Sequence, residues 1–158
     1  MRIQLFILII TAFGITLSGC SKNESQTTEM SDNPLFSEST LPFQTPDFEA
    51  IQPEHYRPAF EAGMKQELEE IEQIAGNPEP PTFENTIVAK EKSGELLNRT
   101  SSVFFNLASA HTNDEIQKIQ KEMAPKLAAH SDDVLLNAQL YDRVRTLYEK
   151  RNELDLNE

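Results

Sequence analysis

Apolar residues follow two different patterns along the chain. From Ile3 to Leu17 the chain carries no charged residue. From Pro53 onwards, apolar residues recur at steps of three and four positions. The second pattern is typical of amphipathic helices, because one helical face repeats about every 3.6 residues. Residues 50–158 contain no long run of alternating apolar and polar residues that would indicate a sheet. We therefore predict an all-α fold.

The first two of about four expected helices are bounded by prolines and a glycine. The first begins near Pro53, where a missing N–H costs nothing, and ends before Gly76. Its outer face is expected to carry a group of carboxylates: Glu67, Glu69, Glu70 and Glu72. The second is capped by Thr82 and is expected to be one long helix to about Ala110.

A glycine inside the second helix and a proline inside the third need separate explanations. We attribute Gly94 to close packing against a crossing helix, since a glycine in a helix interior costs about 1 kcal/mol relative to alanine. The third helix begins near Thr112, whose hydroxyl is in capping-box register with Glu115. Pro125 should kink this helix or mark a restart, because it lacks a backbone donor.

The last helix is expected to begin near Asn137. Leu140, Val144 and Leu147 would face inwards, with Tyr148 as a further candidate. The complete prediction is an antiparallel bundle of helical hairpins, with one long helix and one proline-kinked helix.

Residues 1–19 have the pattern of an export signal. A 15-residue uncharged stretch follows Arg2, and as a helix it would span about 22 Å, which is less than the ~30 Å of a bilayer core. This length favours a signal peptide over a transmembrane helix. The stretch ends in Leu17-Ser18-Gly19-Cys20, which resembles the lipobox of bacterial lipoproteins. The resemblance implies cleavage between Gly19 and Cys20 and a lipid on the Cys20 thiol. The alternative is an ordinary signal peptide that happens to contain a cysteine.

Lipidation at Cys20 would anchor the chain to a membrane of the bacterial envelope. Several acyl chains together give a durable anchor, whereas one chain alone does not. Ser21 follows the cysteine, and this resembles the signal for the outer membrane in Gram-negative bacteria. There the protein would face the periplasm.

Residues 20–48 separate this anchor from the expected helical region, residues 49–158. The first part is rich in Ser, Thr, Asn and Glu and has too little apolar surface to fold. The second part, residues 34–48, combines three prolines with Leu and Phe residues. Proline disfavours a helix, so we expect an extended strap lying on a protein surface. A disordered proline-rich linker is the alternative.

Composition and charge exclude several classes of function. The net charge of −12 argues against a nucleic-acid partner, because phosphate binding requires an excess of Lys and Arg. The single cysteine excludes an intramolecular disulfide framework and a multi-cysteine zinc site. No Gly-x-Ser-x-Gly or glycine-rich phosphate loop is present.

The three histidines do not form a recognisable metal motif. His55, His111 and His130 lie on or beside different expected helices, and none has a second histidine four residues away. A His-Glu-x-x-His zinc site needs two imidazoles one turn apart on one helix. We therefore assign no catalytic residue and no metal ligand, and we expect capping or partly exposed roles for these side chains.

An ordered series of segments resembles the amino-terminal helical region of the thimet oligopeptidase family of zinc metallopeptidases, particularly the bacterial peptidyl-dipeptidases (dipeptidyl carboxypeptidases). The series covers about residues 34–158. Its members are His55-Tyr56-Arg57-Pro58-Ala59-Phe60-Glu61, Pro81-Thr82-Phe83-Glu84-Asn85-Thr86, Ser93-Gly94, Leu96-Leu97, Val103-Phe104-Phe105-Asn106-Leu107, Thr112-Asn113, Ala124-Pro125-Lys126-Leu127, His130, Leu136-Asn137 and Tyr148 to Arg151.

The resemblance implies an almost entirely helical protein with a deep channel between two lobes. In this family, zinc is held by His-Glu-x-x-His and a downstream glutamate in the carboxy-terminal half. No position of this chain matches that motif, so zinc is expected only in a full-length relative and not in this chain. The dipeptidyl branch releases dipeptides from the carboxy terminus of oligopeptides. The resemblance therefore implies a channel-wall segment that stops before the catalytic domain and is inactive alone.

Two other hypotheses remain open at this point. The chain could be a non-catalytic helical lipoprotein that binds a partner or a peptide. It could also be a channel-wall half that complements a separately encoded catalytic half. The DNA downstream of codon 158 would discriminate between them, because a reading frame that leads to His-Glu-x-x-His would favour a peptidase.

Overall fold

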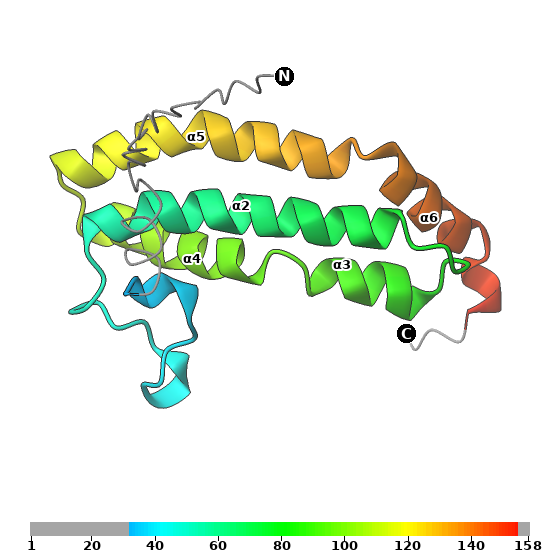
Figure 1. Cartoon of the computed structure of the whole chain (residues 1–158), viewed down its shortest axis with the longest axis horizontal. Helices are drawn as coiled ribbons and strands as arrows, with labels where there is room; N and C mark the ends of the chain where they lie inside the picture. Colours follow the sequence, from blue (N-terminus) through cyan, green and yellow to red (C-terminus); the bar gives the residue numbers. More distant parts are fainter. Residues whose placement is uncertain (1–31, 155–158) are drawn as a thin grey trace, which may run out of the picture.

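The computed structural model describes residues 32–154, and the secondary structure of this part of the chain is helical. Helix α2 (Pro53–Ala75) lies in the middle of the molecule, with α5 (Asp114–Leu135) along one side and α3 (Ala89–Glu91) and α4 (Glu95–Ala110) along the other (Figure 1). Helix α6 (Ala138–Glu149) crosses one end. The all-α prediction is confirmed.

Helix α2 begins and ends at the residues that the sequence predicts. Pro53 is its first residue, and the backbone N–H of Gln52 donates to Nδ1 of His55 (3.0 Å), which satisfies a donor at the amino-terminal end. The helix ends at Ala75, and the N–H of Gly76 donates to the carbonyl of Glu72 (2.8 Å). His55 therefore has the expected capping role.

The single long helix that we expected after Thr82 is instead broken into pieces. Thr82 caps a π-helical turn, η3 (Phe83–Val88), which leads into the short α3; the chain then turns at residues 92–94 before α4 begins. Gly94 has φ of 71°, a left-handed conformation that breaks the helix and that glycine adopts at little cost. The close packing that we expected at Gly94 is present, but it occurs at a helix break rather than inside a helix.

Helix α5 is continuous from Asp114 to Leu135 and passes through Pro125, so Pro125 does not mark a restart. The amino-terminal cap also differs from the prediction, which placed it at Thr112. The side chain of Asn113 accepts from the N–H of Ile116 (2.9 Å). Both residues can cap a helix, and the sequence spacing alone did not distinguish them.

Helix α6 follows the sequence prediction except at its last turn. Asn137 caps it by accepting from the N–H of Leu140 (2.9 Å). Leu140 and Leu147 are buried as expected, whereas Tyr148 is exposed. The suggestion that Tyr148 faces inwards was therefore wrong.

The larger apolar core lies between α2, α4 and the first half of α5. Its centre is a group of T-shaped aromatic pairs, with ring centroids 4.9 Å apart for Tyr56 and Phe104 and 5.3 Å apart for Phe60 and Phe104. Burial raises the pKa of the Tyr56 phenol. A second, smaller core joins α2 to α5 and α6 and includes Ile71, Val134 and Leu140.

No helix within residues 32–154 is long and apolar enough to cross a membrane. The expected signal peptide, its expected cleavage site at Gly19 and Cys20, and the expected lipid attachment at Cys20 lie outside the described residues.

Candidate functional site

An open groove separates the strap, residues 34–48, from helix α4. Its volume is about 520 Å³, and Leu35, Leu41 and Asp47 line it on the strap side while Asn98 and Arg99 line it on α4. The strap is less extended than expected, because it contains two single 3₁₀ turns, η1 (Pro34–Phe36) and η2 (Pro42–Gln44).

The first turn of the strap is fixed to the helices. Leu35 is buried in the larger core. The side-chain amide of Asn33 donates to the carbonyl of His55 (2.8 Å), and Nε of Arg99 donates to the carbonyl of Leu35 (3.2 Å). Burying one leucine contributes about 1.5–3 kcal/mol, so these contacts hold this end of the strap against α2 and α4.

The later part of the strap forms a loop, residues 39–48, that we call the Phe43 loop. It extends away from the helices (Figure 1). Leu41 and Phe48 are about half exposed, and Phe43 is fully exposed at 102%. Phe43 and Gln44 have φ of 59° and 55°, a region that costs non-glycine residues about 1–3 kcal/mol each.

Hydrogen bonds within the loop maintain this strained conformation. The Ser39 hydroxyl donates to the Thr45 carbonyl (2.6 Å), and the Thr45 hydroxyl donates to the Pro42 carbonyl (2.7 Å). The N–H of Gln44 donates to the carbonyl of Leu41 (3.0 Å). The exposed ring of Phe43 is therefore presented by an ordered turn.

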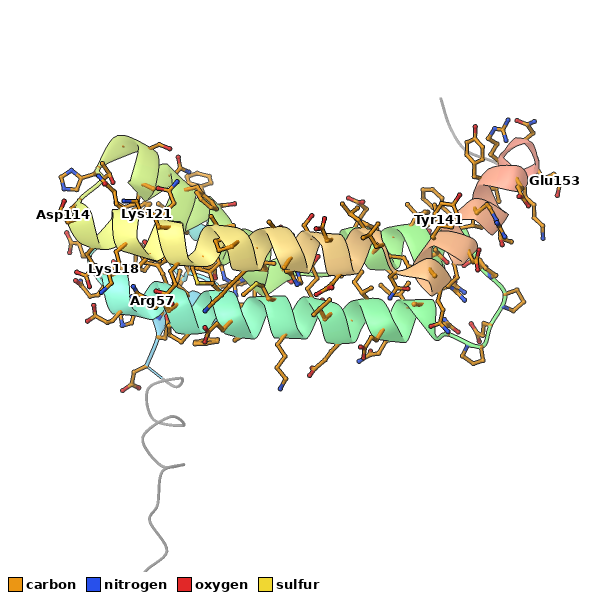
Figure 2. The ribbon with its side chains drawn as sticks, turned by 90° about the horizontal axis from the view of Figure 1, so that it is seen from above. Arg57, Asp114, Lys118, Lys121, Tyr141 and Glu153 are labelled. Carbon is orange, nitrogen blue, oxygen red and sulfur yellow. The ribbon has the colours of Figure 1, made fainter. Side chains whose placement is uncertain are left out.

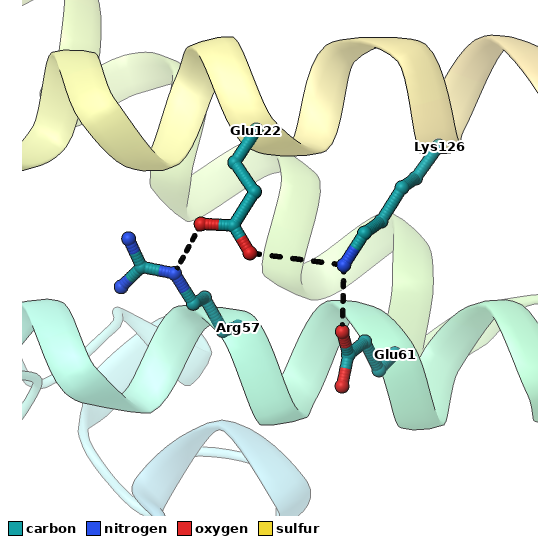
Figure 3. A network of polar contacts seen from close by, with 4 residues as sticks. All are labelled: Arg57, Glu61, Glu122 and Lys126. Carbon is teal, nitrogen blue, oxygen red and sulfur yellow. Dashed lines mark hydrogen bonds and ion pairs between the residues drawn. The ribbon is translucent and has the colours of Figure 1, made fainter.

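Charged side chains connect the exposed edges of α2 and α5 (Figure 3). Nε of Arg57 lies 2.7 Å from a carboxylate oxygen of Glu122, and Nζ of Lys126 lies 2.8 Å from Glu61 and 3.7 Å from Glu122. The hydrogen bond from Arg57 lowers the pKa of Glu122, and the hydrogen bond to Glu61 raises the pKa of Lys126. Seen from above, Arg57 lies at the end of α2 that is near Lys118 and Lys121 of α5 (Figure 2). This network links the exposed edges of the two helices.

A buried polar contact joins α2 to α5 further along the bundle. Nε2 of His130 lies 2.7 Å from a carboxylate oxygen of Glu67, and these side chains are 7% and 19% exposed. Nδ1 of His130 is buried without a hydrogen-bond partner. The prediction that Glu67 and Glu70 lie on the outer face was wrong, because both carboxylates contact the chain at Gly94.

Glu67 and Glu70 instead support the turn before α4. The Glu70 carboxylate accepts from the N–H of Gly94 (2.8 Å). A Cβ atom at Gly94 would lie 2.6 Å from the carboxyl carbon of Glu67. Gly63 lies on the same face of α2, where a Cβ atom would lie 2.9 Å from the Leu97 backbone. The spacing of Gly63, Glu67 and Glu70 at four and three residues is the sequence signal that could have revealed this face.

Arg143 forms a third polar site at the other end of the bundle. It is 7% exposed, and its Nη1 donates to the carbonyls of Asn77 (2.9 Å) and Glu79 (3.1 Å) while its Nη2 donates to Oδ1 of Asn85 (2.9 Å). One guanidinium therefore joins α6 to the loop after α2 and to η3. Sequence reasoning missed this residue, although its spacing from Leu140 and Leu147 puts it on the apolar face of α6.

The histidines of the structure do not form a zinc site. His55 caps α2 and His111 is exposed after α4, as expected, whereas the expectation of a capping or partly exposed role was wrong for His130, which is buried and pairs with Glu67. Within residues 32–154, no group of three or more His, Cys, Asp or Glu side chains could hold a metal ion. His130 and Glu67 alone are two ligands at most, whereas a protein zinc site uses three or four. The described residues do not fit a zinc ion, which the family resemblance implies only for a full-length relative.

Comparison with known proteins identifies the relatives of this chain. The dipeptidyl carboxypeptidase of Salmonella typhimurium is 46% identical over 129 residues, which are 82% of this chain and 19% of that protein. The dipeptidyl carboxypeptidase of Escherichia coli is 48% identical over 124 residues, which are 78% of this chain and 18% of that protein. Over more than three quarters of its length, the chain is therefore homologous to a stretch of the dipeptidyl carboxypeptidases.

The relationship extends to oligopeptidases at lower identity. Oligopeptidase A of Escherichia coli is 28% identical over 125 residues, which are 79% of this chain and 18% of that protein. The chain spans about a fifth of the length of these relatives. No family model matches it. The resemblance to the thimet oligopeptidase family, and to its dipeptidyl carboxypeptidases in particular, is confirmed.

Proposed function

We propose that this chain is the amino-terminal channel-wall segment of a lipid-anchored zinc peptidyl-dipeptidase, an enzyme that releases dipeptides from the carboxy terminus of oligopeptides. The observation that carries the proposal is the 46–48% identity to two dipeptidyl carboxypeptidases over more than three quarters of this chain. Other parts of such an enzyme would supply the zinc and its ligands, and the chain alone is expected to be inactive.

The contribution of this segment would be mechanical. The Glu67–His130 contact, the Arg57–Glu122–Lys126–Glu61 network and the Arg143 contacts all join one helix or turn to another. Substrate positioning depends on rigid supporting elements, because small displacements of a bound substrate are costly to catalysis. We infer that these contacts keep the helices in fixed positions beside an oligopeptide.

A chimeric enzyme tests the peptidase part of the proposal. Residues 32–154 of this chain would replace the matched stretch of the Escherichia coli dipeptidyl carboxypeptidase, which is 48% identical. We expect the chimera to release dipeptides from an oligopeptide and to lose this activity with a chelator. A control chimera would carry an unrelated helical segment of the same length. A well-folded but inactive chimera would contradict the proposal.

The isolated chain provides a second test of the same proposal. We expect the purified 158-residue chain to leave oligopeptides intact and to bind no stoichiometric zinc. Peptide cleavage by this chain that a chelator abolishes would contradict the assignment of the zinc chemistry to another part.

The lipid anchor requires a test of its own. It is supported by the uncharged stretch from Ile3 to Leu17 and by Leu17-Ser18-Gly19-Cys20. Cells that express the protein would be labelled with palmitate and compared with cells that express Cys20→Ala. We expect label in the parent only, with the parent in the envelope fraction and, in a Gram-negative host, in the outer membrane. A Cys20→Ala variant that still incorporates palmitate would rule out lipidation at Cys20.

A further inference from the structure

We propose that the Phe43 loop is a docking element, and that Phe43 inserts into an apolar socket with a rim of Lys and Arg side chains. The socket would lie on the polypeptide that forms the rest of the peptidyl-dipeptidase. This inference rests on the proposed function and names the surface through which the segment contacts the remainder of the enzyme.

The Phe43 loop is ordered before any partner binds. The Phe43 ring is fully exposed, and the backbones of Phe43 and Gln44 are both held in left-handed conformations. The hydrogen bonds from Ser39 and Thr45 keep the loop in this shape. An aromatic side chain that is ordered before binding loses little conformational entropy when it enters a socket. Leu41 and Phe48 in the same loop supply further exposed apolar surface.

The charge around the loop defines the chemistry of the partner surface. Residues 32–56 contain five carboxylates and neither Lys nor Arg. Glu38, Asp47 and Glu49 take part in none of the ion pairs found among the described residues. These carboxylates would repel an anionic membrane surface and attract a basic rim. A protein socket therefore fits the loop better than a bilayer does.

The comparisons favour the remainder of the enzyme as that partner. The matched stretch makes up only 18–19% of the dipeptidyl carboxypeptidases. In such a protein about four fifths of the chain lies outside the matched stretch and is available to cover an exposed aromatic ring. A second copy of this chain and a lipid surface become outcomes of the test.

Cysteine labelling measures whether the loop is covered. Phe43→Cys would be made in the full 158-residue chain with Cys20→Ser, and also in the Escherichia coli chimera described above. Both would be treated with a maleimide, and labelling of position 43 would be followed by peptide mass spectrometry. We expect labelling in the chimera to be slower by about tenfold or more, since the centre of a protein interface excludes solvent. Lys65→Cys is the matched control, because Lys65 is 79% exposed on α2.

A second variant keeps the test independent of cysteine chemistry. Phe43→Ser should lower the melting temperature of the chimera and leave that of the 158-residue chain unchanged or higher, because Phe43 has no buried contacts there. The Phe83→Ser variant, at a partly exposed phenylalanine outside the loop, is the comparison. Equal effects of Phe43→Ser in the two proteins would overturn the proposal.

The outcomes separate this inference from the proposed function. Rapid labelling of position 43 in an active chimera would overturn the docking proposal and leave the proposed function intact. An inactive chimera with rapid labelling would overturn both. Slow labelling of a dimeric 158-residue chain would assign the loop to self-association, and slow labelling only with added phosphatidylglycerol vesicles would assign it to a membrane. Either of these results would overturn the proposal.

Discussion

Glu67 and His130 are 63 residues apart in the sequence, yet a carboxylate oxygen of Glu67 lies 2.7 Å from Nε2 of His130 between α2 and α5. The same carboxylate packs against Gly94, where the chain turns into α4. Three separate segments of the chain therefore meet at one largely buried acidic side chain. This contact connects both α5 and the turn before α4 to α2.

We predict that Glu67→Gln destabilises the protein by about 1–3 kcal/mol, because a neutral amide replaces the carboxylate that contacts His130 and Gly94 between largely buried side chains. Urea unfolding followed by circular dichroism would measure the loss. A double-mutant cycle with His130→Leu should show coupling, with the double variant less destabilised than the sum of the single variants. Glu72→Gln, on the exposed part of α2, is the control. Additive effects at Glu67 and His130 would contradict the contact.

Replacement of Gly94 should also destabilise the protein. Gly94→Ala would place a side chain at φ of 71° and a Cβ atom 2.6 Å from the Glu67 carboxyl carbon, so we expect a loss of about 1–3 kcal/mol. Gly76→Ala is the matched control, since Gly76 has a negative φ and its nearest neighbour would be a carbonyl oxygen at 3.1 Å. Thermal unfolding of both variants would test this. Equal melting temperatures for the two alanine variants would contradict it.

The Arg143 contacts predict a local effect. Arg143→Lys retains the charge, but its single ammonium nitrogen cannot occupy the positions of both Nη1, which donates to Asn77 and Glu79, and Nη2, which donates to Asn85, so buried acceptors lose their partners. We expect a destabilisation of about 1–3 kcal/mol, with faster amide hydrogen exchange in residues 77–88 than elsewhere. Arg145→Lys, two residues away and half exposed, should change neither property. Uniformly faster exchange throughout the bundle would argue against a local role.

Acid should weaken the connection between α2 and α5. The hydrogen bond from Arg57 lowers the pKa of Glu122 in the folded protein, so the ionised Glu122 carboxylate stabilises the fold. This stabilisation is present above the ordinary carboxylate pKa and is lost as the pH falls through the lowered value. The hydrogen bond to Glu61 raises the pKa of Lys126 in the folded protein. The stabilisation from the Lys126 ammonium is therefore present below the ordinary lysine pKa and disappears as the pH rises through the raised value. We expect Glu122→Gln to lower the melting temperature slightly at neutral pH and to have no effect in strong acid.

Melting curves between neutral pH and strong acid would check this prediction, with Glu115→Gln as the control on an exposed position of the same helix. The expected effect is small because the pairs are solvent-exposed and water screens them. A Glu122→Gln effect that persists unchanged in strong acid would show that the ion pair is not its cause.

The sequence predicted local features of this protein well. Pro53 and Gly76 bound α2, Asn137 caps α6, and the spacing of apolar residues identified Leu140 and Leu147 as buried. These features depend on interactions within about one helical turn, so they can be read from neighbouring residues. The family relationship could also be recognised from sequence, because the ordered segments remain recognisable without knowledge of their packing.

Tertiary structure decided the features that join distant segments. The break at Gly94 arises where α2 approaches the turn before α4. The inward positions of Glu67 and Glu70 depend on partners that are 63 and 24 residues away, respectively. The same is true of Arg143, whose partners lie 58 to 66 residues away. Helical periodicity shows which residues share a face, but only packing shows what that face meets. A charged side chain is buried when a distant partner satisfies it, and the local sequence does not contain that partner.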